Sequence, residues 1–199
     1  MIPIFANELN EVLFYTVFFV FYGADFVMTY GIPLTRGRRE VRKRERKSFF
    51  IFFATMYFTV TFSFFFGYFS YYSGIGELPL LFLYVGTSLI IVGESFRLWA
   101  IFTLNKYFSP VVTVYSDHRV VTRGPYGYVR HPAYGGGAIS LLGIALSTRS
   151  LFSLVLLLPA ILVFNYRANI EERLLIESLG EEYVKYKSKV RKKFIPFLY

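Results

Sequence analysis

The feature that most constrains this chain is an uncharged stretch of 22 residues, 49–70, in which ten side chains are Phe. A helix needs about 20 apolar residues to cross a bilayer core of roughly 30 Å, so the stretch predicts a transmembrane helix. Residues 13–28 and 78–104 have the same character. The chain as a whole is 55% hydrophobic. We therefore expect an integral membrane protein.

Two shorter apolar stretches follow, residues 133–148 and 151–166. Only Arg149 and Ser150 separate them, which predicts a tight helical hairpin. Pro159 is expected to kink the second helix of the hairpin. The sequence thus predicts an all-α integral membrane protein with about five transmembrane helices, the last two of which form a tight hairpin.

Basic residues predict the orientation of the chain. The loop 35–48 holds eight Lys and Arg residues, residues 105–132 hold four, and the tail after residue 166 holds eight. Five spans place all three regions on one side, which is expected to be cytoplasmic. The N-terminus is then outside and the C-terminus inside. An amphipathic helix that contains Tyr183 and Tyr186 is expected to lie on the cytoplasmic surface of the membrane.

Several functional classes are disfavoured by composition. The net charge of +9 is explained by orientation and by attraction to anionic lipid headgroups. No nucleic-acid-binding motif accompanies the basic runs, so membrane lipids are expected partners and nucleic acid is not. There are no cysteines, which excludes disulfides and thiolate metal sites. Neither G-x-G-x-x-G after a strand nor a P-loop occurs, and no metal site is predicted.

A polar loop rich in Gly, Pro and Tyr, residues 120–137, precedes the fourth span. His131 stands before Pro132, a position that disfavours helix, whereas Pro132 suits the first turn of the helix that follows. Backbone N–H groups at such a helix start can bind a carboxylate or a phosphate. A single interfacial His is more often structural than functional. A functional role for His131 is favoured by its polar neighbours, which are Tyr126, Tyr128, Arg130 and Tyr134.

The fifth span ends in a second polar cluster. Arg167 and Glu171 have i,i+4 spacing, which on its own predicts an ordinary interfacial ion pair. Gly180 is expected to end this helix. Earlier in the chain, Arg97 is expected to pair with Glu94 or to extend toward the interface. Asp25, near the end of the first span, receives no predicted role.

Together these motifs resemble one family. The run GPYGYVRHPAYGGG, residues 124–137, is similar to the G-P-Y-x-x-V-R-H-P-x-Y-x-G pattern of the isoprenylcysteine carboxyl methyltransferases. The run RLWAIFTLNKYFSPVV, residues 97–112, resembles the segment that precedes this pattern in the family. The C-terminal pattern is matched by Glu171, Glu172, Gly180, Tyr183, Tyr186 and residues 195–196.

The resemblance covers roughly residues 95–199 and implies one membrane-embedded methyltransferase domain, 1–199, of which 1–94 mainly span the membrane. It implies S-adenosyl-L-methionine as the cofactor. The acceptor is then a lipophilic small molecule or a lipidated substrate, foremost the carboxylate of an isoprenylcysteine. The implied catalytic residues are Arg167 and Glu172. The implied cofactor-binding residues are Tyr126, Val129, His131, Tyr134, Gly136 and Glu171.

Other interpretations stay open at this point. A phospholipid N-methyltransferase needs a proton acceptor, for which Glu172 is the candidate. An NADPH-dependent reductase of the sterol-reductase type shares the R-H-x-x-Y feature, and the final KKFIPFLY resembles that group. Pro132 and the Glu171–Glu172 pair favour methyl transfer. A non-enzymatic scaffold or transporter subunit is disfavoured, because transporters place their polar groups near mid-bilayer.

Overall fold

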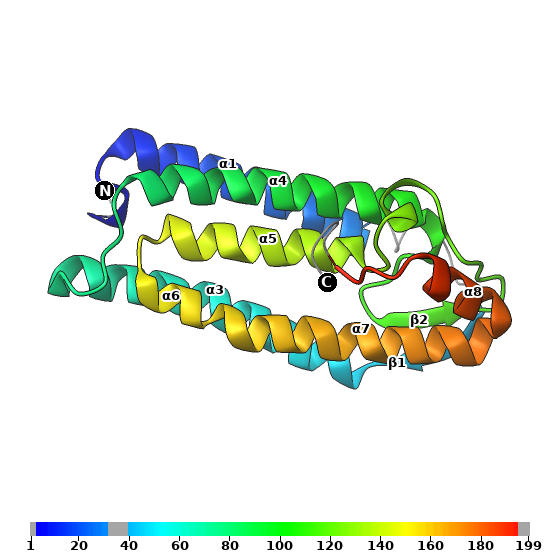
Figure 1. Cartoon of the computed structure of the whole chain (residues 1–199). Coiled ribbons are helices and arrows are strands. Elements are labelled where there is room, and N and C mark those ends of the chain that lie inside the picture. The colour runs from blue at the N-terminus through cyan, green and yellow to red at the C-terminus, as the bar shows by residue number, and fades with distance from the viewer. Residues whose placement is uncertain (1–2, 32–39, 195–199) are drawn as a thin grey trace.

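The computed structural model describes residues 3–31 and 40–194 of the chain. Part of the predicted basic loop and residues 195–196 of the C-terminal pattern lie outside the described residues. Long helices run side by side, with two short strands and a small helix at one end (Figure 1). The elements are α1 (Glu8–Phe26), β1 (Val41–Glu45), α3 (Lys47–Ser73), α4 (Leu81–Leu104), β2 (Val112–Tyr115), α5 (Pro132–Ser147), α6 (Leu151–Val155), α7 (Leu157–Leu179) and α8 (Glu181–Lys189).

Four helical stretches of the described chain are long and apolar enough to cross a membrane: Glu8–Gly31, Lys47–Ser73, Leu81–Tyr107 and Leu151–Leu179. They contain four of the predicted spans, and they make the chain a multi-pass integral membrane protein. The remaining predicted span corresponds to α5, which has 16 residues. At 1.5 Å per residue α5 rises about 24 Å, less than the hydrocarbon core. The count of five spans therefore stays a prediction.

The helix α5 lies inside the bundle, between α4 and the α6–α7 pair (Figure 1). Its contact with α4 depends on small residues. A Cβ atom added to Gly93 of α4 would lie 2.5 Å from the backbone nitrogen of Ser140. A Cβ atom at Gly136 of α5 would lie 2.5 Å from the carbonyl oxygen of Gly93. Small residues allow membrane helices to approach this closely.

The predicted hairpin turns at Arg149, which adopts a positive φ of 55° between α5 and α6. The predicted kink at Pro159 takes the form of a break between α6 and α7. Pro159 cannot donate the hydrogen bond that a continuous helix would require three residues into α7. Beyond this break α7 continues past the predicted apolar span, which ends at residue 166, and it ends at Leu179, where Gly180 caps it with φ 59° as expected.

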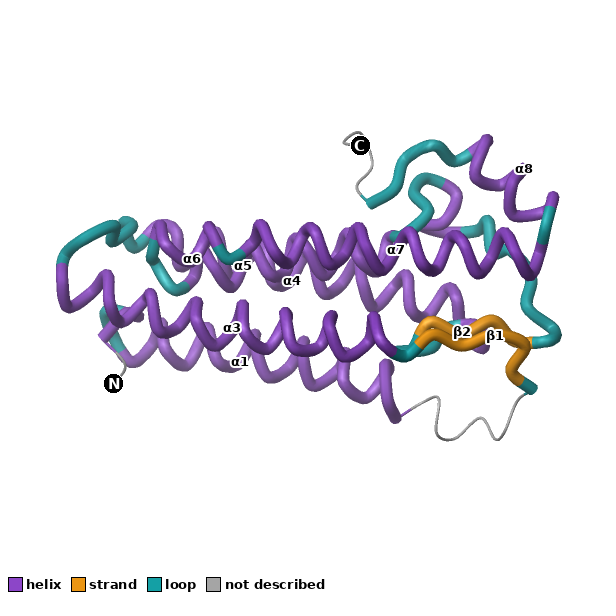
Figure 2. Tube along the Cα trace, turned by 90° about the horizontal axis from the view of Figure 1, so that it is seen from below, coloured by secondary structure: helices purple, strands orange, loops and turns teal. Residues whose placement is uncertain are grey.

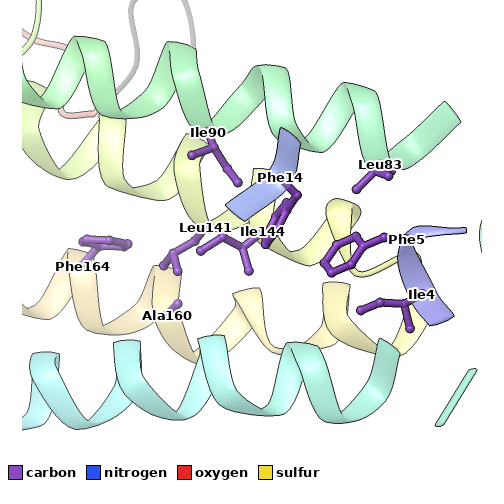
Figure 3. Close-up of a cluster of buried hydrophobic side chains, with 9 residues drawn as sticks. All are labelled: Ile4, Phe5, Phe14, Leu83, Ile90, Leu141, Ile144, Ala160 and Phe164. Atoms are coloured by element: carbon purple, nitrogen blue, oxygen red, sulfur yellow. The ribbon is translucent and has the colours of Figure 1, made fainter. Parts of the chain in front are cut away.

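The hydrophobic core runs along the inner faces of the helices (Figure 3). Phe14 of α1, Ile90 of α4 and Ile144 of α5 are at most 1% exposed. The outer faces of α1 and α3 instead leave many large apolar side chains exposed, as expected for lipid contact. Phe58 of α3 is 46% exposed and Phe19 of α1 is 67% exposed.

The all-α prediction missed a two-stranded antiparallel sheet, in which Val41 pairs with Tyr115 and Glu45 with Val112. The strands lie side by side beyond the start of α3 (Figure 2). The sequence VRKRE of β1 has no apolar alternation, so only its pairing with the β-branched VTVY of β2 makes it a strand. A hydrogen bond from Arg42 to the carbonyl oxygen of Ser178, 2.8 Å long, fixes β1 to the end of α7.

Candidate functional site

Polar side chains gather at one end of the bundle around a cavity of about 430 Å³. Its walls come from α1, α3, α4, β2, the loop before α5, α5 itself, α7 and α8. Five of the eight predicted site residues line this cavity: Tyr126, His131, Tyr134, Arg167 and Glu171. The other three, Val129, Gly136 and Glu172, lie behind the cavity wall. The structure therefore brings the predicted site residues into one region.

The loop before α5 is shaped as the sequence predicts. His131 has the non-helical angles φ −127° and ψ 62°, and Pro132 occupies the first turn of α5. The C-terminal segment crosses this loop, because the backbone nitrogen of His131 donates to the carbonyl oxygen of Lys193 over 2.8 Å. The side chain of Lys193 donates to Asn165 and Asn169 of α7. The segment thus joins the start of α5 to α7.

Arg167 of α7 is almost fully buried. Its Nε donates to the hydroxyl of Tyr134 over 2.9 Å, and its Nη2 donates to the carbonyl oxygen of Pro110. The guanidinium also lies 5.0 Å from the ring centre of Phe52. Nη1 has no hydrogen-bond partner among the described residues. Arg167 thus presents one unsatisfied donor nitrogen at the wall of the cavity.

The predicted ion pair between Arg167 and Glu171 is wrong in its detail. The hydroxyl of Tyr134 lies between them, accepting from Arg167 and donating to Glu171 Oε2 over 2.9 Å. Spacing within α7 alone could not reveal this, because Tyr134 comes from α5. The arrangement holds the phenol, the guanidinium and the carboxylate in a fixed order along one wall of the cavity.

Glu172 has a different environment from Glu171. It is buried and accepts from three side chains: Arg130 Nε at 2.7 Å, His131 Nε2 at 3.1 Å and Lys187 Nζ at 2.6 Å. These partners belong to the loop before α5 and to α8. Arg130 also donates to the carbonyl oxygen of Val190. Glu172 therefore joins three segments of the site from outside the cavity.

The two tyrosines of α8, Tyr183 and Tyr186, close one side of the cavity. Tyr183 and Tyr186 are buried and line the cavity, so they do not face the membrane surface as the sequence suggested. The hydroxyl of Tyr186 donates to the carbonyl oxygen of Tyr126 over 2.8 Å. Burial raises the pKa of Tyr186 and of Tyr183, so both phenols are neutral hydrogen-bond donors. Their i,i+3 spacing on one face of the helix was the available signal.

Sequence reasoning also missed a group deeper in the bundle. Arg97 pairs with Asp25 of α1, not with Glu94: the distance from Nε to Oδ1 is 2.8 Å. Asp25, which received no predicted role, lines the cavity together with Glu94 and Arg97. Only the tertiary contact between α1 and α4 reveals this pair.

Comparison with known proteins identifies relatives of this chain. The sequence model of the isoprenylcysteine carboxyl methyltransferase family matches residues 84–177. The protein-S-isoprenylcysteine O-methyltransferase of Saccharomyces cerevisiae is 36% identical over 109 residues, which are 53% of this chain and 46% of that protein. A probable protein-S-isoprenylcysteine O-methyltransferase of Oryza sativa subsp. japonica is 33% identical over 118 residues, which are 58% of this chain and 61% of that protein. The chain thus spans about half to three-fifths of the length of these relatives.

A solved structure agrees with these matches. The eukaryotic intramembrane Ras methyltransferase, an isoprenylcysteine carboxyl methyltransferase, superposes with a TM-score of 0.62 and 27% sequence identity. The superposition covers 71% of this chain and 52% of that protein. The matched family segment contains α5 and most of α7, which carry Tyr134, Arg167 and Glu171. In sequence and in fold the chain is therefore similar to the isoprenylcysteine carboxyl methyltransferase family.

Proposed function

We propose that this protein transfers a methyl group from S-adenosyl-L-methionine to the carboxylate of a lipidated acceptor of the isoprenylcysteine type. The observation that carries the proposal is the unsatisfied Nη1 of Arg167. A buried guanidinium is normally fully hydrogen-bonded, so a spare donor at a cavity wall suits an anionic ligand. An ionised carboxylate is already nucleophilic and needs orientation more than a base.

Arg167 is fixed well enough to orient such a group. Tyr134 and Pro110 hold two of its nitrogens, and the ring of Phe52 supports the guanidinium plane. The third nitrogen is left to hold one oxygen of the acceptor carboxylate. We propose Arg167 as the catalytic residue that sets the direction of attack. A guanidinium fixed in this way loses little entropy when it binds.

The cavity also suits the methyl donor, whose bound form supplies an electrophilic methyl group on a positive sulfur. A carboxylate and aromatic side chains favour such a cation, and the wall offers Glu171, Tyr126 and Tyr134. Tyr183 and Tyr186 add neutral phenols. We propose that the donor is held by Tyr126, Val129, His131, Tyr134, Gly136 and Glu171, with Val129 and Gly136 acting through the backbone.

We propose that Glu172 is needed for the reaction through its neighbours. It orients His131 at the cavity wall and holds Arg130, while Lys187 brings α8 over the site. Glu172→Gln keeps the shape but weakens three charge-assisted contacts. We expect this variant to lose cofactor affinity and turnover together, whereas Arg167 variants lose turnover alone.

The lipid part of the acceptor fits the apolar side of the cavity. Phe26 of α1 and Phe53 of α3 line the cavity, and they are also 64% and 56% exposed on the outer surface of the protein. The cavity therefore reaches the lipid-facing surface near these two rings. An acceptor that stays in the bilayer can extend its chain along Met56 and Val60 toward Arg167.

We also propose the predicted topology of five spans, with the N-terminus outside and the C-terminus in the cytoplasm, and a single domain over residues 1–199. The cysteine-free sequence allows a direct test with an impermeant thiol reagent on intact cells. Ile75→Cys should be labelled, whereas Lys43→Cys and Lys185→Cys should react only after the cells are opened. Labelling of Lys43→Cys in intact cells would contradict this orientation.

Purified protein in detergent tests the activity. Calorimetry should detect binding of S-adenosylhomocysteine but not of NADPH. A labelled methyl group should then pass to an S-prenylated N-acetylcysteine, and mild base should release it because the product is an ester. Binding of NADPH in place of S-adenosylhomocysteine would favour a reductase. A base-stable product would point to methylation of nitrogen.

A further inference from the structure

The cavity contains a second polar group of residues within the helices, formed by Asp25 of α1 and by Glu94 and Arg97 of α4. All three side-chain nitrogens of Arg97 have hydrogen-bond partners. Its Nε and Nη2 lie 2.8 and 3.4 Å from the two carboxylate oxygens of Asp25, and its Nη1 donates to the carbonyl oxygen of Ala133 over 3.3 Å. Asp25 and Arg97 therefore neutralise each other and need no ligand.

Glu94 forms no ion pair among the described residues, although Arg97, Tyr22 and Ser140 lie near it. It precedes Arg97 by three residues on α4 and is only 2% exposed. Its Oε2 has no hydrogen-bond partner within the described part of the chain. Burial of an unpaired carboxyl group inside a membrane helix is costly, and such groups usually mark a functional site. Glu94 also lines the same cavity as Arg167.

The first turn of α5 connects Glu94 to the proposed site of reaction. Arg97, one turn after Glu94, donates to the carbonyl oxygen of Ala133, and the next residue is Tyr134. The hydroxyl of Tyr134 accepts from Arg167. Arg167, with an unsatisfied donor, and Glu94, with an unsatisfied acceptor, thus line one cavity. The first turn of α5 contacts the helices that carry both residues, α7 and α4.

A ligand that satisfies both groups carries a carboxylate and a hydrogen-bond donor. The carboxyl-terminal residue of a peptide has this chemistry, because its α-nitrogen carries an N–H group one carbon from the carboxylate. Resting on the methyl transfer proposed above, we infer that Glu94 accepts a hydrogen bond from this nitrogen. Glu94 is then a specificity-determining residue, which selects acceptors of the amino-acid type over simple lipid carboxylates.

Three acceptors with the same prenyl thioether separate the possibilities. S-prenylated N-acetylcysteine offers an amide N–H, S-prenylated cysteine offers an ammonium, and S-prenylated 3-mercaptopropionate has no nitrogen. A site that is built for a polar contact strongly disfavours an analogue that lacks the contact. We expect wild-type kcat/KM to be at least about 10-fold lower for the acceptor without nitrogen.

Two variants test whether Glu94 causes the preference for acceptors that contain nitrogen. Glu94→Met removes the acceptor oxygen at similar volume, and it should bring the three kcat/KM values to within about 2-fold of one another. Glu94→Gln keeps an acceptor oxygen but not the charge. It should therefore retain the preference for the amide acceptor and lose the preference for the ammonium. The Gln variant also covers the case in which the Met variant does not fold.

Thr59→Val is the matched control, since Thr59 of α3 also has a buried, unpartnered oxygen but does not line the cavity. It should leave the discrimination between acceptors unchanged. Wild-type protein that uses all three acceptors equally would overturn the role of Glu94 and leave the proposed methyl transfer standing. Transfer to none of the three would contradict both. Weaker binding of S-adenosylhomocysteine by Glu94→Gln would assign Glu94 to the donor and overturn the inference.

Discussion

Each end of the helical bundle holds an arginine, Arg149 partly buried and Arg167 buried, and the two differ in whether the protein satisfies their hydrogen bonds. At the end where α5 turns into α6, all the donor nitrogens of Arg149 have acceptors: Nε and Nη1 donate to the carbonyl oxygens of Leu78 and Ile4, and Nη2 lies 2.7 Å from Glu77. At the opposite end, Arg167 leaves Nη1 without a partner among the described residues.

The comparison separates an arginine that holds the fold from one that is available to a ligand. The contacts of Arg149 join the turn between α5 and α6 to the turn before α4 and to the N-terminal segment. A hydrogen bond between the hydroxyls of Ser70 and Ser150 joins the same turn to α3. Arg167 instead stands at a cavity of about 430 Å³. The unsatisfied nitrogen of Arg167 is the feature that suits a ligand.

The largest expected effect is on turnover at Arg167. Arg167→Ala should lower methyl transfer to a prenylated carboxylate about 100-fold or more, because an aligned donor to the reacting group is lost. Arg167→Lys should also be impaired, since an ammonium cannot keep the contacts to Tyr134 and Pro110 together with a third. Turnover is measured with labelled donor, and S-adenosylhomocysteine affinity should stay close to wild type. Near-wild-type turnover in Arg167→Ala would show that Arg167, like Arg149, serves only the fold.

The second effect should appear in stability, at Arg149. Arg149→Ala removes two partly buried hydrogen bonds and the contact with Glu77, so we expect a loss of about 2 kcal/mol in the free energy of unfolding. Thermal unfolding in detergent checks this value. The folded fraction of the variant should keep normal kcat. A selective loss of kcat with normal stability would show that Arg149 also serves the reaction.

A smaller effect on stability is expected at the close contact between α4 and α5. Gly93→Ala places a methyl group against the backbone of Ser140, which should destabilise the protein by about 1–2 kcal/mol. Gly23→Ala on α1 is the control, because nothing lies within 4 Å of its added Cβ. Alanine is the better helix former, so this control should be neutral or slightly stabilising. Equal melting temperatures for the two variants would show that α4 and α5 can separate easily.

The smallest effect is expected on the exposed surface. Lys185 and Glu181 of α8 form a pair at 3.6 Å whose side chains are 79% and 91% exposed. Solvent and salt screen such pairs, so Lys185→Ala should shift neither the melting temperature nor turnover measurably. A clear loss of activity would mean that the solvent-facing side of α8 contributes to the site, and not only its tyrosines.

The sequence was most informative where one segment carries the whole signal. Unbroken apolar runs predicted the long helices, and the Gly180 cap and the Pro132 helix start were readable from single residues. The contacts that define the site come from different segments. Tyr134 separates Arg167 from Glu171, and Asp25 reaches Arg97 from a helix 72 residues away in sequence. Local spacing carries no record of such contacts.

The basic strand β1 was missed for the same reason. Its charges match the positive-inside pattern and predict only a loop, whereas its structure depends on β2, which follows α4. Similarly, the lysines of α8 directed attention to the membrane surface, while its tyrosines turn inward to the cavity. Charge predicts a cytoplasmic side for these segments, whereas packing decides what they contact.

The close approach of α4 and α5 has a consequence for engineering this protein. These two helices meet through backbone atoms at Gly93 and Gly136, and they carry Glu94 and Tyr134 on one rigid frame. α1 and α3 also contribute apolar side chains to the cavity, such as Phe26 and Phe53, which make none of these polar contacts. A library restricted to these apolar positions should therefore alter which lipid chain lengths are accepted, while the frame that orients the reacting groups is unchanged.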